Sequence, residues 1–340
     1  MEPLRIGVLG AARISEYAIT APASLTGARL VAVAARDTDR ARSFARQHGV
    51  ERVVESYRDL VEDPEVEVVY NPLANGLHGP WNLRAIAAGK HVLTEKPSAS
   101  NLPEAVAVEG AAREAGVHVM EAFHYRYHPV MLRMMELTAS GDLGEIVHID
   151  ASMEIPAPPD EDPRWSLALA GGAMMDLGCY SLHVNRTLGA YLGGDPLLLS
   201  ATAGERAQDP GVDAWVKAEL LFPSGATGSA NCDMDAKAVS FTLTVTGTRG
   251  EALAHNLLAP AADDRITVTR GTQRTVEALG KRTSYTYQLE ALARWIREGI
   301  AVPTDAADAV VNMRMIDAVY EAAGMKPRPA FGSAGLPTGE

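Results

Sequence analysis

The feature of this sequence that most constrains its fold is the alternation of short apolar runs with longer helical patterns in its first third. A glycine stands where each helix would end, which is the preferred use of glycine at helix C-termini. Strands separated by helices of this length predict βαβ units and a parallel sheet. The expected strands are 5–9, 29–34, 66–70, 91–93 and 117–120, and the expected helices are 37–47, 77–88 and 103–115.

The rhythm changes after about residue 122, where strand patterns begin to follow one another directly. This order predicts a large, mostly antiparallel sheet with helices on one face. A chain of 340 residues also exceeds one ordinary core, so we expect an α/β domain over 1–122 and an α+β domain over 123–340, the second for substrate binding and oligomerisation. The expected elements are helices 130–139, 287–298 and 305–323 and strands 146–154, 214–222, 226–233, 240–246, 251–255 and 266–269.

Charge and cysteine content exclude several classes of function. The formal net charge of −12 argues against a nucleic acid or an anionic membrane as partner, because both need basic surface. No apolar run approaches the roughly 18 residues of a membrane helix, and no signal peptide is expected. The two cysteines, Cys179 and Cys232, fit no metal-ligand spacing and no disulfide framework, so we expect no metal and a cytoplasmic location.

The turn after the first expected strand is a candidate pyrophosphate site. Residues 7–15 read G-V-L-G-A-A-R-I-S, and the pattern G-x-G-x-x-G would place its glycines at Gly10, Ala12 and Ser15. Small residues can serve the tight turn, the close approach and the helix packing that these positions need. Pyrophosphate would then lie on the N-terminus of the next helix, beside Arg13 and Ile14. We therefore expect residues 1–122 to form a Rossmann domain. The alternative is that residues 7–15 form an ordinary strand-to-helix turn that binds no dinucleotide.

The end of the second expected strand bears on the choice of cofactor. About 20 residues past Ser15, where an NAD-preferring site carries an acid, the chain has Ala35 followed by Arg36. A missing acid with an adjacent arginine favours a 2′-phosphate, so we expect NADP(H) to be preferred. NAD(H) is possible if Asp37 reaches the ribose, although we interpret Asp37 as the N-cap of the following helix.

Five further segments carry a family resemblance. They read N-P-L-A-N-G-L-H (71–78), A-G-K-H-V-L-T-E-K-P (88–97), M-E-A-F-H-Y-R-Y-H-P (120–129), G-G-A-M-M-D-L-G-C-Y-S-L-H (171–183) and Y-Q-L-E-A-L (287–292). In this order they resemble the glucose–fructose oxidoreductase, inositol dehydrogenase and rhizopine-catabolism (Gfo/Idh/MocA) family over nearly the whole chain. E-K-P followed at this distance by D-x-G-x-Y is the specific part, and Tyr180 resembles the branch that carries tyrosine there rather than histidine.

The resemblance implies hydride transfer between a nicotinamide and a carbon bearing a hydroxyl or carbonyl in a sugar, keto-sugar, cyclitol or diol. It implies Lys96, Asp176 and Tyr180 as the polar catalytic groups. The candidate cofactor contacts are Gly10, Ala12, Arg13, Ile14, Ala35, Arg36, Pro72, Asn75, His78, Glu95 and Lys96. The candidate substrate contacts are Lys96, Arg126, Asp176, Tyr180 and His183.

The residues themselves support this chemistry. Asp176, Tyr180 and His183 are spaced i, i+4, i+7 and would share one helix face. Tyrosine has a pKa near 10 and is a poor base unless a cation such as Lys96 lowers it; in reduction it donates a proton to the developing alkoxide. Asp176 would orient Lys96 or bind a substrate hydroxyl.

Each of these residues also has a structural alternative. Tyr180 could be a packing residue, Asp176 a helix-surface acid and Lys96 a solvated loop residue. His183 could complete the core, and His78 could cap its own helix. Arg126 could equally pack at the domain junction. Those six alternatives remain open at the level of sequence.

Two other functions remain as alternatives to the oxidoreductase. One is a glycoside-processing enzyme that uses a tightly bound nicotinamide through a keto intermediate without net redox change. The other is a non-catalytic NADP-binding regulator, which would have no need of the set Lys96, Asp176 and Tyr180. The strand 214–222 has apolar residues on one parity, and we expect this face of the sheet to form a homodimer or homotetramer.

Overall fold

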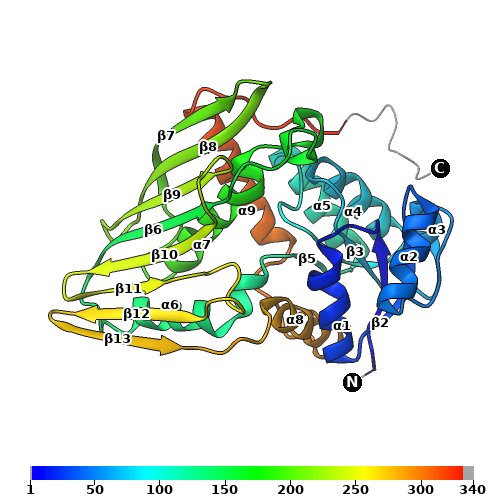
Figure 1. Ribbon diagram of the computed structural model, residues 1–340, viewed down its shortest axis with the longest axis horizontal. Helices are drawn as coiled ribbons and strands as arrows, with labels where there is room; N and C mark the ends of the chain where they lie inside the picture. Colours follow the sequence, from blue (N-terminus) through cyan, green and yellow to red (C-terminus); the bar gives the residue numbers. More distant parts are fainter. Residues whose placement is uncertain (1, 332–340) are drawn as a thin grey trace.

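The computed structural model of the protein describes residues 2–331 and places two sheets side by side, with helices around and between them (Figure 1). The first sheet has five parallel strands in the order β2-β1-β3-β4-β5, so the expected parallel sheet is confirmed. Its strands are β1 Arg5–Leu9, β2 Arg29–Ala34, β3 Val68–Asn71, β4 His91–Thr94 and β5 Val119–Glu121. They are almost wholly buried, as expected for strands covered on both faces.

Helices cover both faces of this sheet. They are a π-helical turn, η1 Glu16–Thr20, that runs into α1 Ala21–Thr26, then α2 Thr38–His48, α3 Tyr57–Glu62, α4 His78–Ala87 and α5 Leu102–Ala115. The Asp37 side chain accepts a hydrogen bond from the Arg40 backbone N–H at 3.0 Å, so the interpretation of Asp37 as an N-cap is confirmed. The short helices α1 and α3 were not expected, because six residues give too little periodicity to recognise.

The second sheet has eight strands in the order β13-β12-β11-β10-β6-β9-β8-β7, and only the β6–β9 pair is parallel. This confirms a mostly antiparallel sheet. Its strands are β6 Ile146–Glu154, β7 Leu197–Arg206, β8 Asp209–Leu221, β9 Thr227–Asp233, β10 Ser240–Gly247, β11 Gly250–Ala254, β12 Arg265–Arg270 and β13 Gln273–Ala278. The sequence gives little sign of the edge strands β7 and β13, because their side chains are largely exposed and lack a clear apolar alternation.

Helices α6 Pro129–Ala139, α7 Cys179–Gly189 and α9 Ala306–Ala322 pack against this sheet. Val216, Ala218 and Leu220 of β8 are buried in the same core as the apolar side chains of α7. The expectation that this parity forms a subunit interface is therefore wrong, because its apolar area is already covered within the chain. Lys217 and Glu219, on the other parity, are exposed.

Helix α8, Ser284–Glu298, returns to the first half of the molecule and lies beside α1 (Figure 1). Its Leu289 and Leu292 are buried in one cluster with Ile6 and Ile19. After α8, the Thr304 carbonyl accepts a hydrogen bond from the backbone N–H of Glu121 at 2.8 Å. The core around the parallel sheet is thus completed from the last third of the sequence. Within residues 2–331 no helix is both long and apolar enough to span a bilayer.

Candidate active site

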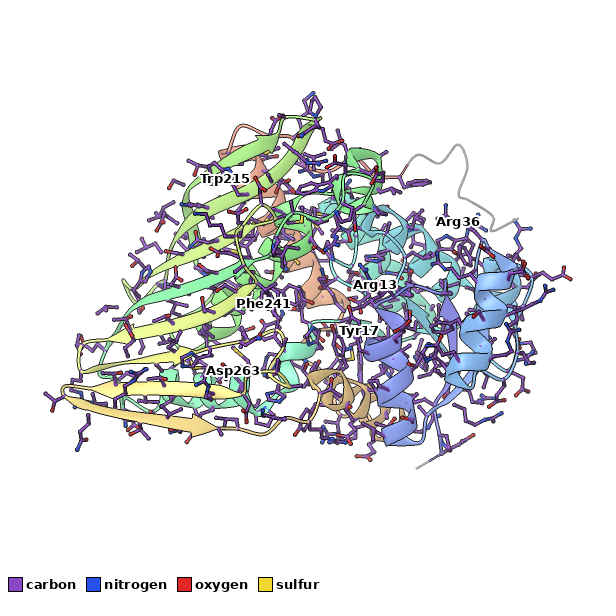
Figure 2. The ribbon with its side chains drawn as sticks, viewed as in Figure 1. Arg13, Tyr17, Arg36, Trp215, Phe241 and Asp263 are labelled. Atoms are coloured by element: carbon purple, nitrogen blue, oxygen red, sulfur yellow. The ribbon has the colours of Figure 1, made fainter. Side chains whose placement is uncertain are left out.

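A cavity of about 1140 Å³ lies between the two halves, at the carboxyl ends of the parallel strands. This is where open α/β sheets bind their ligands. Figure 2 labels Arg13 and Tyr17 in the half with the parallel sheet and Phe241 in the half with the second sheet, with Arg36 farther from Phe241. The sequence-predicted residues on its wall are Gly10, Ala12, Arg13, Ile14, Ala35, Arg36, Pro72, Asn75, His78, Glu95, Lys96, Asp176 and Tyr180.

The turn after β1 has the shape that a dinucleotide needs. Gly10 has a φ of +83°, and a Cβ at this position would meet the Leu73 side chain at 3.1 Å. Only glycine adopts this conformation without cost. The next residues, Ala11 and Ala12, also line the cavity, and the continuous helix of η1 and α1 begins at Ser15. Backbone N–H groups at such a helix start can hold pyrophosphate, so the residues present fit the cofactor.

The residues that follow β2 place basic side chains in the cavity wall, at the end away from Lys96 and Tyr180. Ala35, Arg36 and Asp37 all line it. Arg40, in the first turn of α2, also lines it, and its Nε and Nη2 donate to the Ala11 carbonyl at 3.1 and 2.7 Å. Arg40 was not among the sequence candidates, because Arg36 precedes the helix cap Asp37 and no helical spacing links the two arginines.

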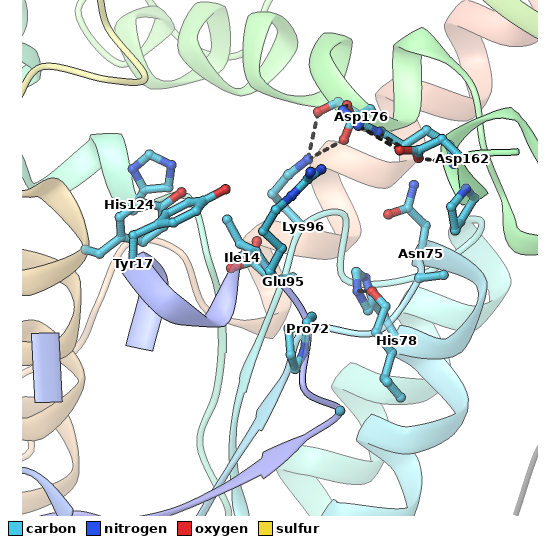
Figure 3. Close-up of a pocket in the computed structure, with 18 of the residues that line it drawn as sticks. Ile14, Tyr17, Pro72, Asn75, His78, Glu95, Lys96, His124, Asp162 and Asp176 are labelled. Atoms are coloured by element: carbon cyan, nitrogen blue, oxygen red, sulfur yellow. Dashed lines mark hydrogen bonds and ion pairs between the residues drawn. The ribbon is translucent and has the colours of Figure 1, made fainter. Parts of the chain in front are cut away.

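Lys96 and Asp176 form an ion pair across the cavity (Figure 3). The Lys96 ammonium donates to the Asp176 carboxylate at 3.1 Å and to the Asp176 backbone carbonyl at 2.7 Å. Burial opposes both charges, yet Asp176 keeps the pKa of Lys96 raised, and Lys96 with Arg164 keeps the pKa of Asp176 lowered. Arg164 lies 3.5 Å from Asp176 and also pairs with Asp162 at 3.0 Å. Both members of the pair are therefore charged near neutral pH.

The Tyr180 ring lies beside this pair. The Lys96 ammonium is 5.1 Å from the ring centroid, and the Tyr180 hydroxyl is 3.4 Å from Nε2 of His124. Burial raises the pKa of Tyr180 well above 10, and the neighbouring Tyr285 and Glu95 add to the effect. The expectation that Lys96 lowers this pKa is not met, because the ammonium is paired with Asp176 and faces the ring. A protonated hydroxyl suits a proton donor.

Two sequence candidates do not line the cavity: Arg126 and His183. His183 stacks on Phe123 at 4.0 Å, and its ring nitrogens lie 2.6 Å from the Tyr125 hydroxyl and 2.8 Å from Asp308. The three-residue helix face is broken because Asp176 belongs to a π-helical turn, η6 Met174–Gly178, whose wider winding changes the register before α7. Arg126 lies in the turn 124–127.

His78 and Asn75 join the loops of the cavity wall. The His78 ring nitrogens lie 2.6 Å from the Pro97 carbonyl and 2.8 Å from the Leu73 carbonyl. Burial lowers the pKa of His78 to about 4, so the ring is neutral and donates to one of them. Asn75 donates across to the Ala170 carbonyl at 3.1 Å.

Glu95, which also lines the cavity, is buried. Its carboxylate accepts a hydrogen bond from Tyr70 at 2.9 Å, and burial raises the pKa of this carboxyl.

An aromatic wall on the other side was not predicted from sequence. Tyr285 packs on His124 with ring centroids 3.9 Å apart and on Tyr17 at 5.9 Å. Figure 3 shows Tyr17 and His124 across the cavity from Asn75 and His78, with Lys96 between them. The rings come from segments far apart in sequence, and no local pattern links them.

Comparisons with known proteins agree with this architecture. Residues 4–123 match the family described as "Oxidoreductase family, NAD-binding Rossmann fold", and residues 131–253 match the "GFO/IDH/MocA C-terminal domain". The chain is 34% identical over 322 residues to D-xylose 1-dehydrogenase (NADP(+)) 2 of Haloferax volcanii, covering 94% of this chain and 97% of that one. It is 35% identical over 256 residues to trans-1,2-dihydrobenzene-1,2-diol dehydrogenase of Sus scrofa, covering 73% of each.

A solved structure is similar over nearly the whole chain. KijD10, a 3-ketoreductase from Actinomadura kijaniata in complex with NADP and TDP-benzene, superposes with a TM-score of 0.87 at 30% identity, over 94% of this chain and 98% of that one. The two family matches together span most of the sequence, including the whole first sheet and most of the second. The chain therefore belongs to the GFO/IDH/MocA family of oxidoreductases, with an NAD-binding Rossmann fold in its first half.

Proposed function

We propose that this protein transfers hydride between NADP(H) and a carbon that bears a hydroxyl or carbonyl in an uncharged sugar, keto-sugar, cyclitol or diol. The observation that carries the proposal is the Lys96–Asp176 ion pair beside Tyr180, in the same cavity as the Gly10 turn and Arg36. Relatives named as an NADP(+)-dependent xylose dehydrogenase and a diol dehydrogenase support it. NADP(H) is preferred over NAD(H) because Arg36 and Arg40 line the ribose end.

When bound, the nicotinamide supplies or accepts the hydride. Side chains of this protein donate or accept the proton. In reduction the Tyr180 hydroxyl gives a proton to the substrate oxygen as negative charge develops on it; in oxidation it takes the proton back. Lys96, held by Asp176, places a fixed positive charge beside the same oxygen. Residues 1–122 act as the cofactor domain and residues 123–340 supply Asp176 and Tyr180.

The charge balance of the substrate side favours a neutral substrate. Lys96 pairs with Asp176, and Arg164 pairs with Asp162 and Asp176, so these two cations are already matched by carboxylates. A phosphate group would need charge-assisted partners there. The neighbouring wall is apolar or aromatic, formed by Tyr17, Ile155, Phe241, Leu258 and Tyr285. A free sugar or diol fits this wall better than a nucleotide-linked one.

A substrate panel tests the proposal. Purified protein is mixed with NADP(+) or NADPH and free aldoses, cyclitols, trans-diols or nucleotide-linked keto-sugars, and nicotinamide absorbance and product are followed together. We expect absorbance to change with a neutral substrate. Product without an absorbance change would instead support glycoside processing through a keto intermediate, and cofactor binding without any product would support a regulator.

We also propose a homodimer or homotetramer in the cytoplasm, joined through the outer face of the second sheet. Leu197 and Leu199 of β7 are exposed, and toward the other end of β7, where Gly204 pairs with Trp215, Trp215 lines a hollow of about 310 Å³. Both cysteines are free, which suits a reducing compartment. Light scattering should give a multiple of the chain mass, and Leu199→Glu should reduce it, whereas Val106→Glu on α5 should not. A monomeric mass for the wild type would refute the assembly.

A further inference from the structure

His124 contacts the Tyr180 hydroxyl from the aromatic wall of the cavity. It follows β5, and its Nε2 lies 3.4 Å from the Tyr180 hydroxyl oxygen. Its Nδ1 lies 2.8 Å from Oγ of Ser284, the first residue of α8. Tyr285 packs against the ring at a centroid distance of 3.9 Å. The imidazole is therefore held in place, and each of its nitrogens faces a hydroxyl group.

The ring is neutral at physiological pH. Burial, together with the charges of Lys96 and His128, lowers the pKa of His124 to about 3. A neutral imidazole carries its single N–H on one nitrogen and accepts at the other. A hydroxyl can donate or accept, so His124 can accept from Ser284 while it donates to Tyr180, or the reverse. This is the arrangement that passes a proton along a line without forming an ion on the ring.

Tyr180 needs such a partner. It is almost fully buried, and burial raises its pKa well above 10, so a phenolate left there after proton donation would be costly. Lys96 is already paired with Asp176 and lies over the ring rather than at the hydroxyl. Ser284 lines the cavity, where it can exchange protons with water. His124 is the group between the two hydroxyls.

We propose that Ser284 and His124 form a proton relay that resupplies Tyr180 during reduction. The relay rests on the proposed function, in which Tyr180 is the proton donor. As the Tyr180 O–H bond breaks and its proton passes to the substrate oxygen, the proton on Nε2 of His124 passes to the phenolic oxygen. The Ser284 hydroxyl proton passes to Nδ1, and water returns a proton to Ser284. One proton enters from solvent, one leaves to the substrate, and oxidation runs the same steps backwards.

Two variants test the relay, measured with the best substrate of the panel. His124→Phe keeps a flat ring against Tyr285 and removes both nitrogens, and Ser284→Ala removes only the hydroxyl. We expect kcat to fall roughly 10- to 100-fold in each, less than the roughly 10²–10⁴-fold worth of the acid itself. The affinity for NADP(H) should stay within about twofold, because neither group reaches the dinucleotide turn. Ser24→Ala, on the exposed side of α1, is the matched control and should behave as wild type.

A solvent-isotope measurement separates a relay from a packing role. The dependence of kcat on the deuterium fraction of the solvent should be curved in the wild type, since more than one proton moves, and should become linear in both variants. Normal turnover of Ser284→Ala with an unchanged curve would overturn the relay, even if His124→Phe were slow. Near-wild-type turnover of Tyr180→Phe would refute the proposed donor itself, which keeps the two failures distinct.

The contacts can also be tested without turnover. In protein labelled with nitrogen-15 histidine, Tyr180→Phe should shift the Nε2 resonance of His124, and Ser284→Ala should shift its Nδ1 resonance. Both resonances should indicate a neutral ring between pH 5 and 9 in the wild type. If neither substitution moves its resonance, the hydrogen-bonded line does not exist and the relay is refuted.

Discussion

The ammonium of Lys96 lies 2.7 Å from the backbone carbonyl and 3.1 Å from the carboxylate of Asp176, although the two residues belong to different halves of the molecule. Lys96 follows β4 in the parallel sheet, and Asp176 lies in the π-helical turn before α7. The contact therefore joins the halves, and it lies at the centre of the proposed reaction site. Changes at either residue should alter chemistry before they alter cofactor binding.

Replacing Tyr180 with Phe should keep the ring packing and remove only the hydroxyl. We expect turnover to fall roughly 10²–10⁴-fold, the usual worth of a positioned acid–base group. The affinity for NADP(H), measured by fluorescence titration, should hardly change. Tyr191→Phe, on an exposed tyrosine outside the cavity, is the control. Near-wild-type turnover of Tyr180→Phe would shift the proton transfer to Lys96.

Replacing Lys96 with Met should reduce turnover by a similar factor, because it removes the positive charge at the reacting oxygen and leaves the Asp176 carboxylate with only Arg164. The double variant Lys96→Met/Tyr180→Phe should be little worse than either single variant, since residues that act as a unit are not additive. Steady-state rates for the wild type and the three variants form the double-mutant cycle. Fully multiplicative losses would mean that the two residues act independently.

Replacing Arg36 with Ala should weaken NADP(H) binding by roughly 10- to 100-fold, since a hydrogen bond to a charged group is worth about 1.5–3 kcal/mol. Binding of NAD(H), which lacks the 2′-phosphate, should change little. Arg42→Ala is a matched control, because Arg42 is in the same helix region but pairs with Asp39 on the surface and does not line the cavity. Tighter binding of NAD(H) than NADP(H) by the wild type would contradict the assignment.

Glu121, buried at the end of β5, should make stability depend on pH. One carboxylate oxygen accepts from the Ser98 N–H at 2.6 Å, and the other has no partner among residues 2–331. Burial, with Asp308 nearby, raises the pKa of Glu121 from 4.5 to about 8. Between these values the unfolded chain loses a proton that the folded chain keeps, so the free energy of unfolding should fall as pH rises, by up to about 1.4 kcal/mol per pH unit.

Urea unfolding of the wild type and Glu121→Gln between pH 5 and 8 measures this dependence. The amide at position 121 cannot ionise, so the free energy of unfolding of the variant should fall less steeply with pH. The difference between the two slopes should correspond to one proton. Any cost of burying the amide adds a constant offset and leaves the slope comparison intact. Parallel curves for the two proteins would contradict the assigned pKa.

Much of the fold could be predicted from local pattern. The parallel strands were recognisable because burial on both faces makes them continuous apolar runs, and Asp37 was recognisable as a helix cap. The exposed edge strands β7 and β13 were not, because they carry no such signal. Apolar parity in β8 indicated that one face is buried, but whether helices of the same chain or a second copy covers it depends on tertiary packing.

The same limit applies to the site. Lys96, Asp176 and Tyr180 belong to two segments that resemble the family, so the resemblance could identify them. The structure brings the three side chains together. His124 lies in the segment 120–129 that carries part of the resemblance, but it was not singled out, and Arg164 and Tyr285 lie outside the five quoted segments and reach the cavity only through the fold. His183 was misplaced because regular helical spacing was assumed across a π-helical turn. Spacing in the sequence predicts which residues share a helix face only where the winding of the helix stays the same.

Helix α8 lies against α1, although the two are separated by most of the sequence. During synthesis the ribosome must complete the whole second sheet before residues 284–298 emerge to cover this surface. The nucleotide half consequently cannot finish folding first, as N-terminal domains commonly do. A fragment ending at residue 122 would leave Ile19 and its neighbours without the side chains of Leu289 and Leu292, so we expect it to expose an apolar surface that the whole chain buries.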